Sequence, residues 1–465
     1  MNIVDCMKLF MEPQSIALIG VSRSVENAIF NPLGNLLSYG YQGKLYPVNP
    51  SADELQGIKS YRSIAELPND VDLTLILTPR DIVPGVVQQC VEKGLKALIV
   101  AAQGFADSDE QGKALQREMV EIIRRGKARI IGPNTFGVTN AFLNMSTSLA
   151  RLELDKTPIG IISQTGVPFL GTSRFKFGKV IDVGDTCDID VADSLEYLES
   201  DPQTSVIVLQ IEGVQAGAKF IQVATRVASK KPTLVLKAGR TVAGAKAAQS
   251  HTGSIVGRDE VYDAAFQQCG IIRVEDIEEM EDLGLAFSQL PPLKGRGVAV
   301  MSWAGSTGVL SVDACEKHGL TVPPLSESTI NRIKTLGPPD WLPVDNPIDL
   351  WACMGLRGFD PRNFKTAFRI ILEALLNEDK ANAVLIVIPD YLSLFNTDDW
   401  DISLVVDDAI RTYKDQAIVF SILGPWGALT NKLQQNKQTV VFRSCERAIH
   451  SLARIHERTI SLEGQ

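Results

Sequence analysis

Short runs of aliphatic and β-branched residues recur along the chain, and each is followed by a longer segment whose apolar positions have helical spacing. This alternation is typical of βαβ units and parallel sheets. Buried strands are expected in three series, at 15–19, 44–48, 73–77, 97–100 and 129–131, then at 159–162, 179–183, 206–210, 233–236 and 271–274, then at 297–301, 383–388 and 417–421. The pattern predicts an α/β protein of three consecutive doubly wound domains.

The boundaries between the expected domains lie in polar and proline-rich stretches. A polar stretch around Glu153–Lys156 separates the first two series, and Pro291–Gly295 favours a linker because proline and glycine interrupt both helices and strands. We predict domains at 1–145, 146–290 and 296–465. The length of 465 residues suits this count at ~150 residues per domain.

Composition narrows the class of protein. The formal net charge of -9 argues against a nucleic-acid partner, because no net basic field is available to displace counterions from phosphates. No apolar stretch approaches the ~18–20 residues of a membrane span, and the first residues do not resemble a signal peptide. The seven cysteines are scattered singly, which favours reduced thiols. We expect a cytoplasmic protein that binds neither membranes nor nucleic acids.

Small and polar residues follow the expected strands of the first domain. The carboxyl ends of parallel strands lie on one edge of a sheet, so these turns should converge on one rim, where phosphate-bearing ligands bind. The candidate ligand-binding residues are Gly20, Ser22, Pro47, Asn49, Thr78, Pro79, Gly104, Phe105 and Asn134. The alternative is that these residues only shape loops. An incomplete Gly-x-Gly-x-x-Gly disfavours a nicotinamide-dependent dehydrogenase.

Two polar segments directly follow expected strands of the second domain. Ser163–Gly166 passes from a buried strand into an expected helix, so its hydroxyls and backbone amides suit a phosphate or a carboxylate. A plain helix N-cap has the same composition. Glu212 stands just beyond another buried strand, where it is either solvated or placed to act on a ligand, and Gly213 would let that ligand approach.

His251, one of four histidines, lies in a segment of small and hydroxylated residues. A lone histidine is most often a surface or core residue. An imidazole is nevertheless a competent nucleophile toward phosphorus when a carboxylate holds its other nitrogen. His318 is expected at the end of a helix, and His450 and His456 in a charged C-terminal helix, so we expect no chemistry from these three.

The segments around His251 resemble a known family. Lys231–Arg240, Ser250–Ser254 and Asp259–Phe266 closely resemble the phosphohistidine region of nucleoside-diphosphate-forming acyl-CoA synthetases, above all the ADP-forming acetyl-CoA synthetases, and more distantly the α subunit of succinyl-CoA synthetase. The resemblance also covers the first domain and the opening of the third, at Ala304–Val309. It implies a Rossmann-like CoA-binding domain followed by two flavodoxin-like CoA-ligase domains.

The resemblance implies a phosphoryl relay. Acyl-CoA and phosphate would give an acyl phosphate and free CoA, and His251 would carry the phosphoryl group to a nucleoside diphosphate. Glu212 matches the glutamate that hydrogen-bonds this histidine in the family, where it would fix the tautomer. The rim of the first domain would bind coenzyme A. The residues expected around the transferred phosphate are Ser163, Gln164, Thr165, Gly166, Thr252 and Gly253.

The family's nucleotide site belongs to an ATP-grasp domain, and three domains leave no room for one in this chain. The resemblance therefore implies a partner, a β subunit with an ATP-grasp domain that holds the Mg-nucleotide, in a hetero-oligomer or a homodimer. The substrates would be CoA and a small carboxylic acid. We expect no metal site in this chain.

Some residues depart from the family pattern. Asn27–Phe30 replaces a Gly-Lys-x-Gly stretch, Thr135 replaces a cysteine, and Thr165 with Pro168 alters the usual Ser-Gln-Ser-Gly-x-Leu run. Trp303 changes the opening loop of the third domain. The departures leave two questions open. The acid is acetate or another small carboxylic acid, and the alternative function is a catalytically reduced CoA-binding or regulatory protein of the same fold.

Overall fold

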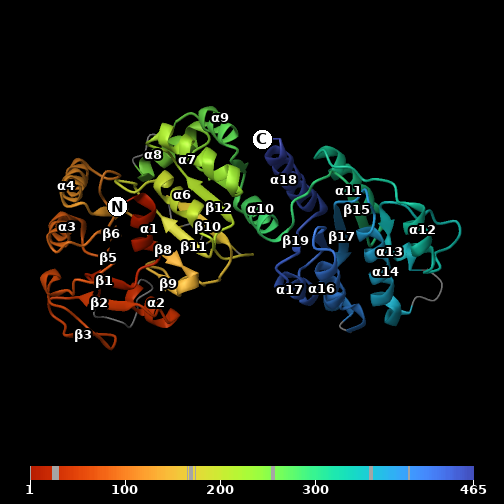
Figure 1. The fold of residues 1–465 in the computed structure, drawn as a ribbon, viewed down its shortest axis with the longest axis horizontal. Helices are drawn as coiled ribbons and strands as arrows, with labels where there is room; N and C mark the ends of the chain where they lie inside the picture. The colour runs from red at the N-terminus through yellow and green to blue at the C-terminus, as the bar shows by residue number, and fades with distance from the viewer. Residues whose placement is uncertain are drawn as a thin grey trace. The chain divides into compact units, whose positions relative to one another are not determined.

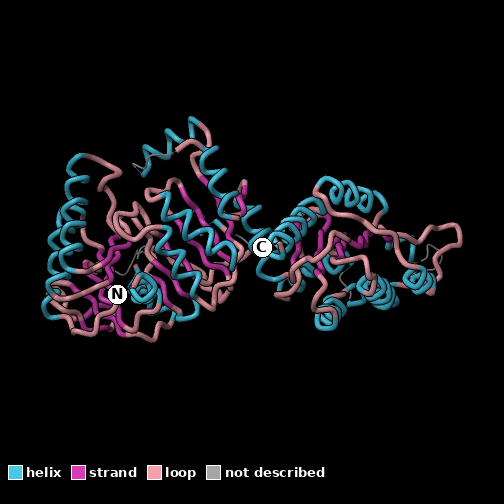
Figure 2. The backbone as a smooth tube through the Cα atoms, turned by 45° about the horizontal axis from the view of Figure 1, so that its top comes forward, coloured by secondary structure: helices cyan, strands magenta, loops and turns pink. Residues whose placement is uncertain are grey.

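The chain forms two compact units, Met1–Glu281 and Asp282–Gln465. The computed structural model describes residues 2–22, 31–164, 166, 171–172, 174–252, 257–354, 360–395 and 398–464, with the backbone alone for 249–252, 361 and 392. Helices pack against three sheets of parallel strands, two in the first unit and one in the second (Figure 1, Figure 2). The predicted α/β class with doubly wound sheets is confirmed.

The first sheet has the parallel strand order β2-β1-β5-β6-β7. Its strands are β1 (Ser15–Ile19), β2 (Lys44–Val48), β5 (Leu73–Ile76), β6 (Ala97–Val100) and β7 (Arg129–Ile131). The associated elements are α1 (Ile3–Met11), α2 (Pro32–Tyr39), the hairpin of β3 (Glu54–Leu55) and β4 (Ile58–Lys59), η1 (Ile64–Glu66), η2 (Arg80–Ile82), α3 (Val83–Glu92) and α4 (Glu110–Gly126). The order reverses between β1 and β5, and ligands bind at such a switch point in doubly wound sheets.

The second sheet repeats this order in its parallel strands, β14-β13-β12-β10-β11. They are β10 (Ile159–Ser163), β11 (Lys179–Asp182), β12 (Val206–Ile211), β13 (Thr233–Lys237) and β14 (Ile272–Val274), with helices α6 (Val191–Ser200), α7 (Gly217–Lys230), α8 (Val242–Thr252), α9 (Asp259–Cys269) and α10 (Ile277–Gln289). The antiparallel strands β8 (Val138–Asn140) and β9 (Met145–Ser146), with η3 (Ala141–Leu143) between them, extend the sheet beyond β11. Residues 138–146 thus add to the second sheet, although the predicted boundary placed 138–145 at the end of the first domain.

The third sheet has the same order again, β16-β15-β17-β18-β19. Its strands are β15 (Val298–Ser302), β16 (Ile348–Asp349), β17 (Ala383–Pro389), β18 (Ala417–Leu423) and β19 (Val440–Phe442). Its helices are α11 (Gly305–Lys317), α12 (Glu327–Lys334), α13 (Leu350–Cys353), η4 (Pro361–Asn363), α14 (Phe364–Leu376), α15 (Tyr391–Phe395), η5 (Asp398–Trp400), α16 (Ser403–Thr412), α17 (Ala428–Gln435) and α18 (Cys445–Glu463). Across the described ranges, no helix is long and apolar enough to cross a bilayer.

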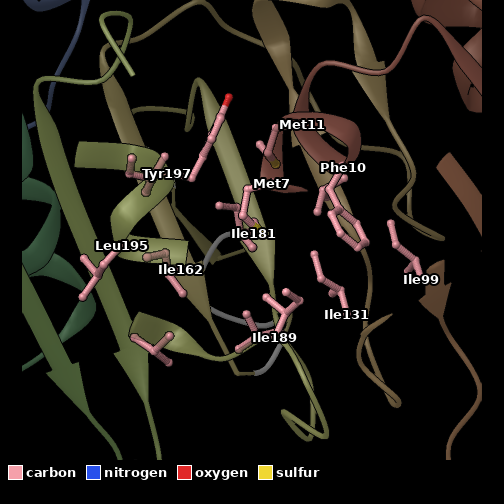
Figure 3. Packing of buried hydrophobic residues seen from close by; sticks show 14 of the residues in the cluster. Met7, Phe10, Met11, Ile99, Ile131, Ile162, Ile181, Ile189, Leu195 and Tyr197 are labelled. Atoms are coloured by element: carbon pink, nitrogen blue, oxygen red, sulfur yellow. The ribbon is translucent and has the colours of Figure 1, made fainter. Parts of the chain in front are cut away.

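The two sheets of the first unit share one apolar core, which includes α1. Met7, Phe10 and Met11 are buried along one face of this helix, at the spacing of an amphipathic helix. Figure 3 shows these side chains between Ile131 of the first sheet and Ile181 of the second, and all five residues belong to one buried cluster. α1 therefore helps to hold the two sheets in a single unit.

The segment that follows β11 covers the edge strand of the first sheet. Three main-chain N–H groups of this segment donate to carbonyls of β7 and the turn after it. They run from Ile189 to Ile130 at 3.0 Å, from Cys187 to Gly132 at 3.1 Å and from Asp185 to Pro133 at 3.0 Å. The pairing closes an exposed sheet edge and brings the carboxyl ends of the two sheets together.

Gly184 stands where these two backbones approach each other. Its φ is +55°, and a Cβ atom there would lie 2.2 Å from the Pro133 carbonyl oxygen and 2.7 Å from that of Asn134. Both oxygens belong to the turn that pairs with the segment after β11. Only glycine fits this approach without moving main-chain atoms.

We expect Gly184→Ala to destabilise the first unit by about 2–4 kcal/mol, because alanine disfavours the left-handed conformation and would overlap two carbonyl oxygens. Gly270→Ala is the matched control. Gly270 has a φ of +71° and open space at its Cβ position, so only about 1 kcal/mol is expected there.

All five tryptophans lie in the second unit, so tryptophan fluorescence follows that unit alone, while circular dichroism follows both. Denaturant titrations should show an earlier circular-dichroism transition in the Gly184 variant and an unchanged tryptophan transition. Equal stability losses in the two glycine variants would contradict this expectation.

Candidate functional site

The switch point of the first sheet brings two candidate residues together. Gly20 follows β1 with a φ of +86°, and a Cβ atom there would lie 3.0 Å from Thr78 Cγ2, beyond the end of β5. The Thr78 hydroxyl is buried and has no hydrogen-bond partner in the described parts of the chain. A close backbone approach beside an unsatisfied hydroxyl is the kind of site in which a ligand supplies the missing partner.

The remaining candidates of the first domain occupy the same rim. Asn49 donates from Nδ2 to the Val21 carbonyl at 3.1 Å, and the Gly104 carbonyl accepts from Arg80 Nη1 at 2.6 Å. Phe105 is fully buried in the core below the rim, so only its main chain can face a ligand. Pro47 is buried within β2, whereas Ser22 and Pro79 are exposed. The departure at 27–30 lies outside the described residues.

A row of polar side chains crosses the carboxyl edge of the second sheet. Ser163, Gln210 and Asp182 are paired in register across β12, β10 and β11, so their side chains share one face of the sheet. Ser163 is fully buried and its Oγ donates to Gln210 Oε1 at 2.9 Å. This buried row lies at the switch point between β10 and β12, where the Ser163–Gly166 segment begins.

Gln164 holds the turn that carries Glu212. Its Oε1 accepts from the main-chain N–H of Glu212 at 2.6 Å and of Gly213 at 3.1 Å, and its Nε2 donates to the Gly213 carbonyl at 2.9 Å. Gln164 thus acts as a peptide-like clamp that joins the ends of β10 and β12. Glu212 is only 6% exposed, so its carboxylate is not the solvated surface group that the sequence left open.

The other residues predicted around the phosphate are described to different extents. Gly166 is buried, and a Cβ atom there would lie 2.5 Å from the Phe136 ring. His251 and Thr252 form the last turn of α8, where only the backbone is described. Thr165 and Gly253 lie outside the described residues. The predicted contact between His251 and Glu212 therefore stays a prediction.

A buried lysine near Glu212 was missed by the sequence analysis. Lys237 ends β13 in register with Ile211, the residue before Glu212, and is 2% exposed. Its Nζ lies 4.6 Å from the centre of the Tyr262 ring, and burial lowers the pKa of this ammonium. The Tyr262 hydroxyl in turn accepts from Val214 N at 3.0 Å. The available signal was a charged residue at the end of an otherwise apolar strand.

The end of β11 and the turn after it hold two carboxyls that the sequence analysis also missed. Asp182 Oδ2 accepts from Phe136 N at 2.7 Å, and Asp185 Oδ1 accepts from Asn134 Nδ2 at 3.3 Å. The second oxygen of each carboxyl is buried without a hydrogen-bond partner among the residues that the structure describes. Burial raises the pKa of Asp182 to about 7 and that of Asp185 to about 8.

Trp303, a departure from the family pattern, packs in an aromatic cluster of the third sheet. Its ring centre lies 4.9 Å from that of Trp351 and 4.6 Å from that of Tyr391. The cluster lies beyond the end of β15, at the switch point of the third sheet. At the same strand end, the hydroxyls of Ser302 and Thr307 form a hydrogen bond of 2.5 Å. Nowhere in the described ranges do three or more His, Cys, Asp or Glu side chains gather in a way that could hold a metal ion.

Two family models match the chain. Residues 14–141 match a CoA binding domain, and residues 156–287 match the succinyl-CoA ligase like flavodoxin domain. The first match covers the first sheet and its rim. The second covers the polar row, Gln164, Glu212 and the His251 segment.

Similar proteins are ADP-forming acetate–CoA ligases. The chain is 38% identical over 414 residues to acetate–CoA ligase [ADP-forming] II of Archaeoglobus fulgidus, which covers 84% of this chain and 60% of that protein. It is 39% identical over 349 residues to the α subunit of acetate–CoA ligase [ADP-forming] II of Pyrococcus furiosus, covering 74% of this chain and 76% of the subunit. The chain thus spans well under two thirds of the longer relative's length.

A solved structure matches along nearly the whole chain. Acetyl-coenzyme A synthetase 1 of Ca. Korarchaeum cryptofilum, solved in complex with phosphate and ADP, has a TM-score of 0.85 at 29% identity, with 99% of this chain and 98% of that chain covered. The matches of sequence and the match of structure indicate the same family. The chain belongs to the family of ADP-forming acyl-CoA ligases, with a CoA-binding domain and a succinyl-CoA-ligase-like domain.

Proposed function

We propose that this chain is the α-like part of a nucleoside-diphosphate-forming acyl-CoA synthetase, which converts acyl-CoA, phosphate and a nucleoside diphosphate into a free acid, CoA and a nucleoside triphosphate. The main support is the buried carboxylate of Glu212, which Gln164 clamps at the switch point of the second sheet. A buried carboxylate at that point suits a histidine that becomes positively charged as it takes a phosphoryl group.

The steps divide between the two rims of the first unit. Acyl-CoA binds along the first rim, from the Gly20 switch point toward Asn134. Phosphate binds over the Ser163–Gly166 segment, where main-chain amides and hydroxyls can hold its oxygens. Its attack on the thioester gives the acyl phosphate, whose phosphoryl group passes to His251 while Glu212 holds the other ring nitrogen. The acid is a small carboxylic acid.

A second polypeptide completes the reaction. We assign the nucleotide site to a β subunit with an ATP-grasp domain that holds the Mg-nucleotide, in a hetero-oligomer or a homodimer of such pairs. The match to the α subunit of the Pyrococcus furiosus ligase supports this division of labour. We place the assembly in the cytoplasm.

Incubating the chain with short-chain acyl-CoA thioesters, acetyl-CoA first, and radiolabelled phosphate should transfer label to the protein. The label should be stable in base and labile in acid, as expected for phosphohistidine, and His251→Asn should reduce it to background. His318→Asn is the matched control, because His318 caps α11 in the second unit and hydrogen-bonds Glu446 at 2.8 Å. Label that persists in the His251 variant would refute the assignment.

CoA binding by calorimetry, without label from acyl-CoA and phosphate or from ATP and the β partner, would instead identify a catalytically reduced CoA-binding protein. That result would support the proposed binding of CoA to the first rim and contradict the proposed reaction.

Glu212→Gln should slow labelling about 100-fold while it preserves the fold, because the amide keeps the size of the side chain but cannot offset the imidazolium charge. The rate of label incorporation in rapid-quench experiments measures this. Glu196→Gln makes the same chemical change in α6, where the carboxylate forms a long 3.7 Å ion pair with Arg226. Similar rates in the two variants would show that Glu212 has no part in the transfer.

A further inference from the structure

Asp185 lies where the two rims of the first unit meet. Its main-chain N–H donates to the Pro133 carbonyl at 3.0 Å, and its Oδ1 accepts from Asn134 at 3.3 Å. Both partners belong to the turn after β7, the last strand end of the first rim. The side chain is only 9% exposed, and its Oδ2 finds no hydrogen-bond partner within the described ranges. One buried carboxyl oxygen therefore remains for a ligand atom.

The position of Asp185 along the rim determines which part of CoA it would meet. The carboxyl ends of β2 and β7 are separated by four strand spacings, roughly 19 Å at ~4.8 Å per strand. In the proposed reaction the thioester reacts beside Ser163–Gly166, the segment of the second sheet that is proposed to bind phosphate. The turn after β7 is the part of the first rim that contacts the second sheet. The sulfur of an extended CoA molecule must therefore lie at the Asn134 end of the rim, next to Asp185.

We propose that the Asp185 carboxyl exchanges a proton with the CoA sulfur during acyl transfer, a role that rests on the proposed function. A phosphate oxygen attacks the thioester carbonyl carbon and forms the C–O bond. The C–S bond breaks, its electron pair stays on sulfur, and Asp185 gives that sulfur its proton. Hydrogen phosphate loses one proton as it becomes the acyl phosphate, and this proton restores the Asp185 acid. The reverse reaction uses the same proton in the opposite direction.

The surroundings of Asp185 suit this exchange. Burial and the neighbouring carboxylates of Asp107, Asp182 and Glu212 raise the pKa of Asp185 to about 8. An ordinary thiol has a pKa of about 8.5, and proton exchange between groups of matched pKa is efficient. A raised pKa keeps the acid form below about pH 8 and loses it above, so thioester cleavage should fall as the pH rises through 8.

Arsenate in place of phosphate isolates the acyl-transfer step, because an acyl arsenate hydrolyses in water and the reaction then turns over without nucleotide or phosphohistidine. Release of free CoA from short-chain acyl-CoA thioesters, acetyl-CoA first, would be followed with a thiol-reactive dye from about pH 6 to about pH 9. Asp185→Asn should lower kcat about 100-fold and abolish the decline near pH 8.

Asp107→Asn supplies a second test that leaves Asp185 in place. Asp107 Oδ1 accepts from Phe105 N at 2.7 Å, a bond that asparagine can keep. Removal of its charge should leave kcat at low pH unchanged and move the alkaline decline to lower pH, by roughly 0.5–1 pH unit. A purely structural Asp185 would give no such shift.

The outcomes separate this role from the proposed function. Wild-type rates and pH profiles in both variants would overturn the role of Asp185 and leave the synthetase intact. Inactivity of Asp185→Asn with an unmoved decline in Asp107→Asn would also overturn it, because the loss would then be structural. A wild-type chain that neither releases thiol nor acquires label would overturn both proposals.

Discussion

The main-chain pairing between the turn after β7 and the segment after β11 determines the geometry of the first unit. Without it the first sheet would end in an open strand edge, and only the shared apolar core around α1 would relate the two rims. The ion pair of Arg129 with Asp188 at 2.8 Å supports the same contact from the side chains. Because hydrogen bonds and a close glycine approach both constrain the pairing, a shift of either backbone would break several contacts together.

Under the proposed function, burial at this junction would let a chain of net charge -9 bind phosphate. Asp182 and Asp185 lie beside the phosphate segment, where two ionised carboxylates would repel an anion. Burial raises the pKa of these carboxyls to about 7 and about 8, so near neutral pH both are largely or partly protonated. When these two carboxyls are protonated, main-chain amides can interact with phosphate without opposition from their charge.

The sequence predicted the parts of this structure that depend on local pattern. The strands at 15–19, 44–48, 97–100 and 129–131 have the predicted bounds, because each is a short run rich in apolar residues and closed by turn residues. β3, β4, β8, β9, β16 and β19 were missed; each has only two or three residues and so offers little pattern, although β7 of the same length was predicted. Residues 138–145 were placed with the first domain because only tertiary pairing assigns them to the second sheet.

Some residues of the candidate site could likewise be selected from the sequence, whereas others are found only in the structure. Glu212 and the Ser163–Gly166 segment follow strands directly, so position along the chain was enough to select them. His251 was selected by its resemblance to a family. Asp185 was not selected, because its importance arises from contacts with Pro133 and Asn134, about fifty residues earlier in the chain. The role of Gln164 as a clamp likewise depends on the geometry of two neighbouring strand ends.

α8, the helix whose last turn contains His251, differs from α7 in how it is anchored. α7 buries Phe220, Val223, Ala224, Val227 and Ala228. In α8, by contrast, Ala248 is the single buried side chain among residues 242–248, and Val242 is 92% exposed. A helix that buries so little apolar surface detaches at a low free-energy cost. In the proposed relay, a carrier histidine that visits two sites would need such a support, and the residues that receive it would need the rigid strand ends that hold Glu212.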